Sequence, residues 1–140
     1  MTTTNLNFSE VTPDLTKEVK DKLDEIRQML PFAVGLSARD RRTNRALGRS
    51  STQFVQHALE NMKQSPTLVP VFVDVATVEN HYAMYNSLLG IKDSVDQLQR
   101  LITDTMHMAG SQANRQSLDF YNSVKRGAKA NVPGAQSVLD

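Results

Sequence analysis

The fold of this chain is decided by one stretch, DSVDQLQRLITDTMHMAGSQANRQSLDFYNSVKRGAK, which occupies residues 93–129. Within it, apolar or small side chains recur every three or four residues, and no proline interrupts them. That spacing places them on one stripe of an α-helix. The stripe is formed by Val95, Leu98, Ile102, Met106, Ala109, Ala113, Phe120 and Val124. Because it keeps its phase across Gly110, we expect one helix of about 37 residues, roughly 55 Å long.

Upstream, the same periodicity predicts three shorter helices, at residues 13–30, 50–64 and 74–89. The first begins with Thr12 as its N-cap and Pro13 at its first position, and Asp74 is a candidate N-cap for the third. The apolar pattern shifts in phase around Gly90, and a glycine suits the left-handed residue just past a helix end. We therefore predict a turn at Gly90 that separates the third helix from the long one.

The segments between these helices are short. Residues 32–36 are apolar but interrupted by Gly35, which predicts a packed connection, and Ser37 is expected to cap a short turn after it. Residues 67–73 resemble a strand locally, but Pro70 and the lack of a second strand in the sequence favour an extended linker. At the ends, residues 1–11 are expected to be a loose segment, and residues 131–140 a turn followed by the start of a further helix.

Together these elements predict an all-α protein. With 140 residues, the chain has the length of a single domain, and we assign residues 1–140 to one. Only eight aromatic residues and no tryptophan occur, which favours helix packing through aliphatic side chains. The predicted architecture is a mostly antiparallel four-helix bundle with one long helix in the C-terminal half.

The composition excludes several classes of protein. The formal charge is +1 and the isoelectric point about 8.0, which disfavours a generally basic nucleic-acid-binding domain. No cysteine is present, so disulfides, thiolate zinc sites and cysteine nucleophiles are excluded. The sequence shows neither a signal peptide nor an apolar run long enough to span a bilayer. We therefore expect a cytoplasmic protein without a membrane span, although a signal peptide removed earlier would leave no trace here.

One segment is strongly basic. It contains a single acid, Asp40, and five arginines, Arg39, Arg41, Arg42, Arg45 and Arg49. Guanidinium groups pair with phosphate or carboxylate oxygens, so the segment could contact an anion, an RNA or an acidic protein. No aromatic side chains alternate with the arginines to stack on bases, which disfavours nucleic acid. A solvated surface segment is the simplest alternative.

The first predicted helix carries the complementary charge. Spacings of four, three and four residues place four carboxylates in one row, those of Asp14, Glu18, Asp21 and Glu25. Such a row is mildly repulsive unless a positive group faces it. The arginine segment of the same chain or of a second copy could do so, whereas the alternative is a solvated face relieved by neighbouring lysines.

No set of residues in the sequence combines the residue types and the spacing of a metal-binding or catalytic site. Asp104 with His107, and His57 with Glu60, are the nearest approaches to the inward ligand pairs of metal-binding bundles, but both lie off the apolar stripe of their helix. His81 lies at the flank of its stripe and is interpreted as a boundary residue. Neither a phosphate-binding loop nor a nucleophile motif occurs. We therefore expect no catalytic residue, no metal and no cofactor.

Four motifs carry a resemblance: LPFAVGL at residues 30–36, FVQHALE at 54–60, LVPVFVDV at 68–75 and FYNSVKRGAKANVPGA at 120–135. With these, the chain resembles a set of short, uncharacterised bacterial helical proteins over most residues after about position 12. The resemblance implies an all-helical bacterial protein with an additional helix beyond Asp140. It implies no active site, and no functional residue follows from it.

From the residues we expect a non-enzymatic helical interaction or self-assembly module, whose partner is a second copy or another protein. The alternative is an anion- or ligand-binding bundle that uses the arginine segment, and an enzyme ranks third. Long amphipathic faces and segregated charge support the first interpretation, because no set of catalytic groups converges. Any stable assembly is expected to bury apolar surface along the far end of the long helix, where the shorter helices cannot cover it.

Overall fold

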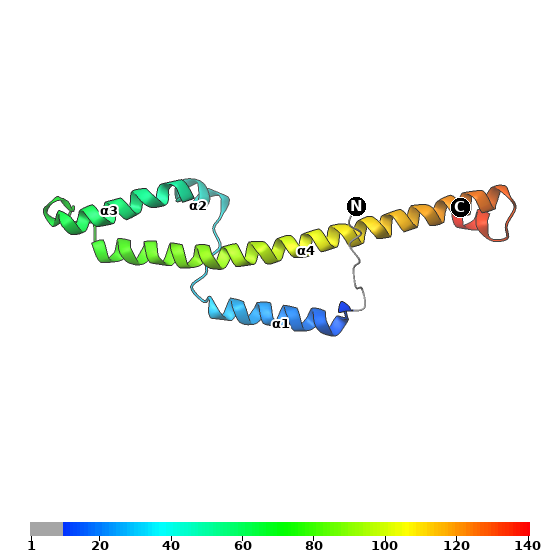
Figure 1. Cartoon of the computed structure of the whole chain (residues 1–140), viewed down its shortest axis with the longest axis horizontal. Helices are drawn as coiled ribbons and strands as arrows, with labels where there is room; N and C mark the ends of the chain where they lie inside the picture. Colours follow the sequence, from blue (N-terminus) through cyan, green and yellow to red (C-terminus); the bar gives the residue numbers. More distant parts are fainter. Residues whose placement is uncertain (1–9) are drawn as a thin grey trace. The chain divides into compact units, whose positions relative to one another are not determined.

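The structure is a computed structural model that describes residues 10–140 (Figure 1). Of the segment 1–11, which was expected to be loose, residues 1–9 lie outside the described part of the chain. The regular elements are α1 (Pro13–Met29), α2 (Ala38–Thr43), η2 (Arg49–Ser51), α3 (Thr52–Gln64), η3 (Pro66–Leu68), α4 (Val75–Lys129) and α5 (Ala135–Leu139). All of them are helical, and residues 10–140 contain no strand. The all-α prediction is therefore confirmed.

The helix starts follow the predicted capping residues. Thr12 caps α1 by accepting a hydrogen bond from the backbone N–H of Leu15 at 3.1 Å. Ser37 and Asp40 form a reciprocal capping box at the start of α2, which extends the expected short turn to six residues. Asp74 accepts a hydrogen bond from the Ala76 N–H at 3.2 Å and so caps α4. Local sequence signals thus set where these helices begin.

Helix α4 corrects one prediction and confirms another. It runs unbroken for 55 residues, about 82 Å at 1.5 Å per residue, through both Gly90 and Gly110. The helix through Gly110 was expected, but the turn at Gly90 was wrong, so the predicted helices at 74–89 and 93–129 are one. The phase shift has another cause: the apolar residues before and after Gly90 lie on faces of the same helix about 130° apart.

Helix α3 runs antiparallel to the first part of α4, and the two form the α3–α4 hairpin (Figure 1). Tyr85 on α4 donates a hydrogen bond from its hydroxyl to the backbone carbonyl of Leu47 at 2.8 Å. At the other end, the Lys63 ammonium lies 2.8 Å from a carboxylate oxygen of Glu79. Leu59 on α3 is only 7% exposed and forms the centre of the small hairpin core. Helix α3 covers the apolar face of the part of α4 that precedes Gly90.

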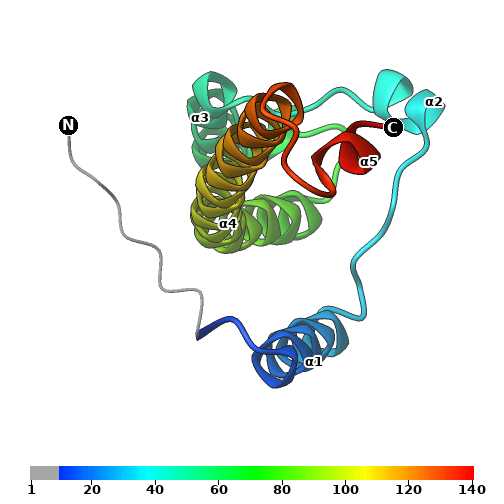
Figure 2. The same ribbon diagram turned by 90° about the vertical axis from the view of Figure 1, so that its right-hand side faces the viewer.

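At its other end, α4 is capped by a tight reversal. The Val132 N–H donates to the carbonyl of Gly127 at 2.8 Å, and Gly134 adopts the left-handed conformation with φ 83°. Helix α5 then lies beside the last turns of α4 (Figure 2). Val124 and Ala135 are each 9% exposed there. A turn and the five-residue helix α5 thus occupy residues 131–140, where a turn and the start of a further helix were expected.

The described chain divides into two units, one ending at Ile91 and the other beginning at Lys92. Among residues 10–140, only Leu59, Val124 and Ala135 are buried. The antiparallel four-helix bundle is therefore not confirmed within one chain. The connection at residues 32–36 was expected to be packed, and this was wrong, because Phe32, Val34 and Leu36 are exposed. No described helix is both long enough and apolar enough to cross a bilayer.

Candidate interaction surfaces

Helix α4 carries a mostly exposed apolar stripe after Gly90, which we name the distal stripe. Its members are Ile91, Val95, Leu98, Ile102, Met106, Ala109, Ala113, Ser117, Phe120 and Val124. The bulky members up to Phe120 are far more exposed than core residues, with Val95 at 53% and Met106 at 68%, whereas Val124 is buried beside α5. Large contiguous apolar surface of this kind marks an interaction site in proteins that keep it accessible. Most of the bulky apolar side chains on the far part of the long helix are thus exposed in the single chain.

The distal stripe has an eleven-residue period. Ile91, Ile102, Ala113 and Val124 are each eleven residues apart, and the members between them repeat at the same interval. Three positions in eleven residues correspond to about 3.67 residues per turn, very close to the pitch of an undistorted α-helix. The stripe therefore drifts by only about 20° in each repeat. A partner helix can follow it for its whole length with little supercoiling.

Polar groups along the distal stripe are already satisfied within the helix. The hydroxyl of Ser117, the polar member of the stripe, donates to the carbonyl of Ala113 at 2.7 Å. Outside the stripe, the Thr105 hydroxyl donates in the same way to the carbonyl of Leu101 at 2.7 Å. Burial of an unpaired hydroxyl costs free energy, whereas one bonded back to its own helix loses little. No Asp, Glu, Lys or Arg belongs to the stripe. The distal stripe can therefore be buried in an interface without leaving an unpaired charge there.

Helix α1 carries a second amphipathic face. Its apolar residues Leu15, Val19, Leu23 and Ile26 remain exposed, and α1 contains no buried residue. The acidic row of Asp14, Glu18, Asp21 and Glu25 lies on the same helix. Asp21 pairs with Lys17 at 3.4 Å, and Glu25 with Lys22 at 3.9 Å. Part of the row is thus neutralised locally, as the alternative interpretation of a solvated face requires.

The arginine segment is divided among several elements. Arg39, Arg41 and Arg42 lie on α2, Arg45 lies in the following connection and Arg49 begins η2. All five are exposed. Among the described residues, no ion pair joins the acidic row of α1 to Arg39, Arg41, Arg42 or Arg45. The predicted contact between the two charged segments therefore remains a prediction.

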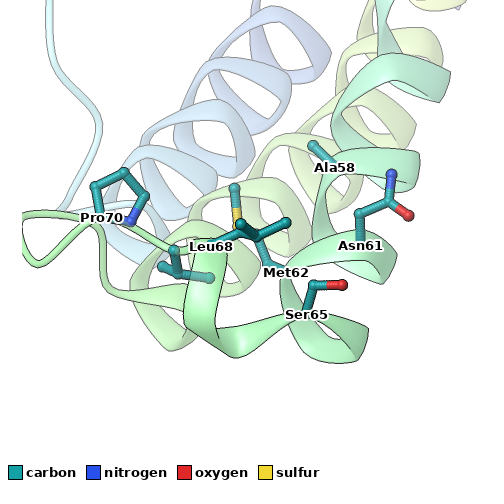
Figure 3. A pocket seen from close by; sticks show the side chains of 7 residues that line it. Ala58, Asn61, Met62, Ser65, Leu68 and Pro70 are labelled. Atoms are coloured by element: carbon teal, nitrogen blue, oxygen red, sulfur yellow. The ribbon is translucent and has the colours of Figure 1, made fainter.

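The tip of the α3–α4 hairpin presents a groove with a volume of about 450 Å³ (Figure 3). It is lined by Ala58, Asn61, Met62, Ser65, Leu68, Val69 and Pro70. None of these side chains is an acid or a base, so the groove lacks a group that could move a proton. Beside it, Val71 and Phe72 are almost fully exposed. Sequence reasoning took this segment for a linker, although its apolar character could have indicated a surface patch.

The residues weighed as metal ligands do not converge. His57, His81 and His107 are exposed on α3 and α4, as are Glu60 and Asp104. Within residues 10–140, no group of three or more His, Asp or Glu side chains is arranged to hold a metal ion.

Comparisons with known proteins do not add a function to these surfaces. No protein-family model, curated protein or solved structure matches the chain. The interpretation of the distal stripe therefore rests on its own composition, spacing and exposure.

Proposed function

We propose that the chain is a non-enzymatic helical interaction module that self-assembles through the distal stripe of α4. The observation that supports this is an uncharged apolar stripe about 50 Å long from Ile91 to Val124, most of which is exposed as far as Phe120. This assembly pairs the α4 helices of different copies and does not require the antiparallel four-helix bundle that the sequence predicted within one chain. As part of this proposal, residues 1–140 form one domain and the chain catalyses no reaction.

The energetics require most of the distal stripe. Completing the burial of one half-exposed aliphatic side chain contributes about 1 kcal/mol. Five bulky members on each of two copies, Ile91, Val95, Leu98, Ile102 and Met106, therefore contribute on the order of 10 kcal/mol. Association costs about 4–15 kcal/mol in lost freedom. A short contact would fail to offset that cost, so the interface must run along several turns.

The test is the molecular mass in solution by sedimentation equilibrium. Leu98→Glu combined with Ile102→Glu places two charges in the distal stripe and should shift the protein to the monomer, because a buried unpaired carboxylate is strongly unfavourable. Gln97→Glu combined with Ser111→Glu adds the same charge on the opposite face of α4 and should leave the mass unchanged. Circular dichroism should show equal helicity for both. A monomeric wild-type chain at high protein concentration would refute the proposal.

A second candidate function is anion binding by the arginine segment. Arg39, Arg41, Arg42 and Arg45 are exposed, and among the described residues no ion pair occupies them. Titration with inorganic phosphate and with a single-stranded RNA oligomer, followed by calorimetry, tests this candidate. The triple variant Arg41→Gln, Arg42→Gln, Arg45→Gln should lose this binding. Such a loss would favour anion binding over a role of these arginines in self-assembly.

A further inference from the structure

We propose that two copies of α4 pair antiparallel along the distal stripe, in the register that places residue i of one copy opposite residue 215 − i of the other. In this register Leu98 faces Ser117 and Ile102 faces Ala113 of the second copy. The inference rests on the proposed self-assembly and adds its orientation and register. Four independent features of the described residues support it.

The first is the spacing of the distal stripe. Its members are separated in turn by four, three, four, four, three, four, four, three and four residues. This order reads the same in both directions, so an antiparallel copy brings every stripe position opposite a stripe position. The midpoint lies between Met106 and Ala109. A shift of one or two residues would break the match along the whole interface.

The second feature is the distribution of side-chain volume. Ile91, Val95, Leu98, Ile102 and Met106 in the first half are bulky, whereas Ala109, Ala113 and Ser117 at the start of the second half are small. Antiparallel pairing sets large against small, which fills the space between two helices evenly. Parallel pairing would align three successive layers of small residues and leave them underpacked.

The third feature is charge. Residues 91–107 of α4 contain three acids and two bases, whereas residues 108–129 contain one acid and four bases. The two halves therefore carry net charges of −1 and +3. Antiparallel pairing brings halves of opposite sign together, and parallel pairing brings like against like. Electrostatic complementarity of this kind contributes more to orientation than to affinity.

The fourth feature is length. Helix α1 has 17 residues and reaches about 26 Å, so it covers about half of the distal stripe if it folds onto it. Helix α3 has 13 residues and already lies on the hairpin face of α4. Among the described helices, only α4 of a second copy is as long as the stripe itself.

At the C-terminal end of the distal stripe, a groove beside α5 marks where the contact between the two α4 helices ends. Phe120, Val124, Val132 and Val138 line part of a groove of about 480 Å³ between α4 and α5. In the proposed register, Ile91 of the second copy reaches this groove. Helix α5 beside it then marks the end of the paired stretch (Figure 2).

The test uses substituted cysteines, because the chain has none of its own. Two single variants, Leu98→Cys and Ser117→Cys, are mixed, unfolded, refolded together and oxidised, one of them bearing a tag that shifts its mobility. The proposed register brings the two positions face to face, within the Cα separation of up to about 7 Å that a disulfide requires. The mixed, cross-linked dimer should form. Random pairing of two chains limits it to about half of all dimers.

Each variant alone should form almost no disulfide dimer, because residue 98 and its own copy are then about 28 Å apart along the helix. Val95→Cys with Phe120→Cys tests the neighbouring layer in the same way, and Ser111→Cys on the opposite face is the matched control. Efficient self-cross-linking of Leu98→Cys alone would show parallel pairing and overturn the inference while leaving self-assembly intact. A wild-type chain that sediments as a monomer would overturn both.

Discussion

The hydroxyl of Tyr85 on α4 lies 2.8 Å from the carbonyl oxygen of Leu47, which precedes α3 by five residues. This hydrogen bond joins positions 38 residues apart and holds the entry to α3 against the long helix. Tyr82, one turn earlier, reaches the carbonyl of Thr52 at the longer distance of 3.4 Å. The two tyrosines thus fix the N-terminal end of α3 on α4.

We expect Tyr85→Phe to destabilise the hairpin by about 1 kcal/mol, because the partly buried Leu47 carbonyl loses its donor. Tyr82→Phe is the matched control, and the longer contact of Tyr82 predicts a smaller loss. Urea unfolding followed by circular dichroism measures both. Equal effects of the two substitutions would show that the hydroxyl of Tyr85 has no special role in the hairpin.

Gly90 lies in the interior of α4, and a Cβ added there meets no atom within 4 Å. Gly90→Ala should therefore raise the free energy of unfolding by up to about 1 kcal/mol, since alanine is the better helix former. Gly134 offers the opposite case, because its φ of 83° disfavours any side chain. Gly134→Ala should lower stability. If Gly90→Ala were also destabilising, the unbroken course of α4 through Gly90 would be in doubt.

Local chemistry in the sequence predicted most of the helix boundaries. Thr12, Ser37 and Asp74 were identifiable as caps because their side chains accept hydrogen bonds from free backbone N–H groups nearby. These interactions involve only residues two or three positions apart. They are the same in an isolated helix and in a folded chain, so the sequence alone suffices to find them.

The turn predicted at Gly90 failed because periodicity reports which face of a helix is apolar rather than where the helix ends. Helix α4 uses one face for α3, up to Leu89, and another for the distal stripe, from Ile91 onward. A change of partner along one helix gives the same shift of phase as a turn. Only the location of the neighbouring helix distinguishes them, and that is tertiary information.

The candidate surface was predictable in part. The apolar stripe and its extension beyond the shorter helices follow from the positions of Val95, Leu98 and Ile102 in the sequence. Its eleven-residue period is also present in the sequence, since Ile102, Ala113 and Val124 are eleven residues apart within the predicted helix. What covers the stripe is not encoded in any single segment, because association depends on the surfaces of two molecules.

The absence of a bound metal is a separate prediction. His57 and His107 lie on different helices and are exposed, and no group of three or more His, Asp or Glu side chains within residues 10–140 is arranged to hold a metal ion. Elemental analysis of protein purified without added metal should show iron, manganese and zinc only at trace levels. Stoichiometric metal that disappears in His57→Ala or His107→Ala would contradict this expectation.

The final prediction concerns the charged segments of α1 and α2. If the arginines meet the acidic row of a second copy, they contribute to assembly together with the distal stripe, and such a contact can repeat from copy to copy. The triple variant Arg41→Glu, Arg42→Glu, Arg45→Glu should then associate about tenfold more weakly than the wild type, since each exposed ion pair contributes only about 0.2–1 kcal/mol. The difference from wild type should shrink in 1 M salt, where the Debye length falls to about 3 Å.

A charge-exchange control identifies the partner of these arginines. Replacing Asp14, Glu18 and Asp21 by lysine in the same chain as the three glutamates restores opposite signs and should recover most of the lost association. Sedimentation equilibrium at low and high salt measures all three proteins. An unchanged mass in the arginine variant, together with loss of binding to phosphate or RNA, would instead assign the segment to anion binding and leave assembly to the distal stripe alone.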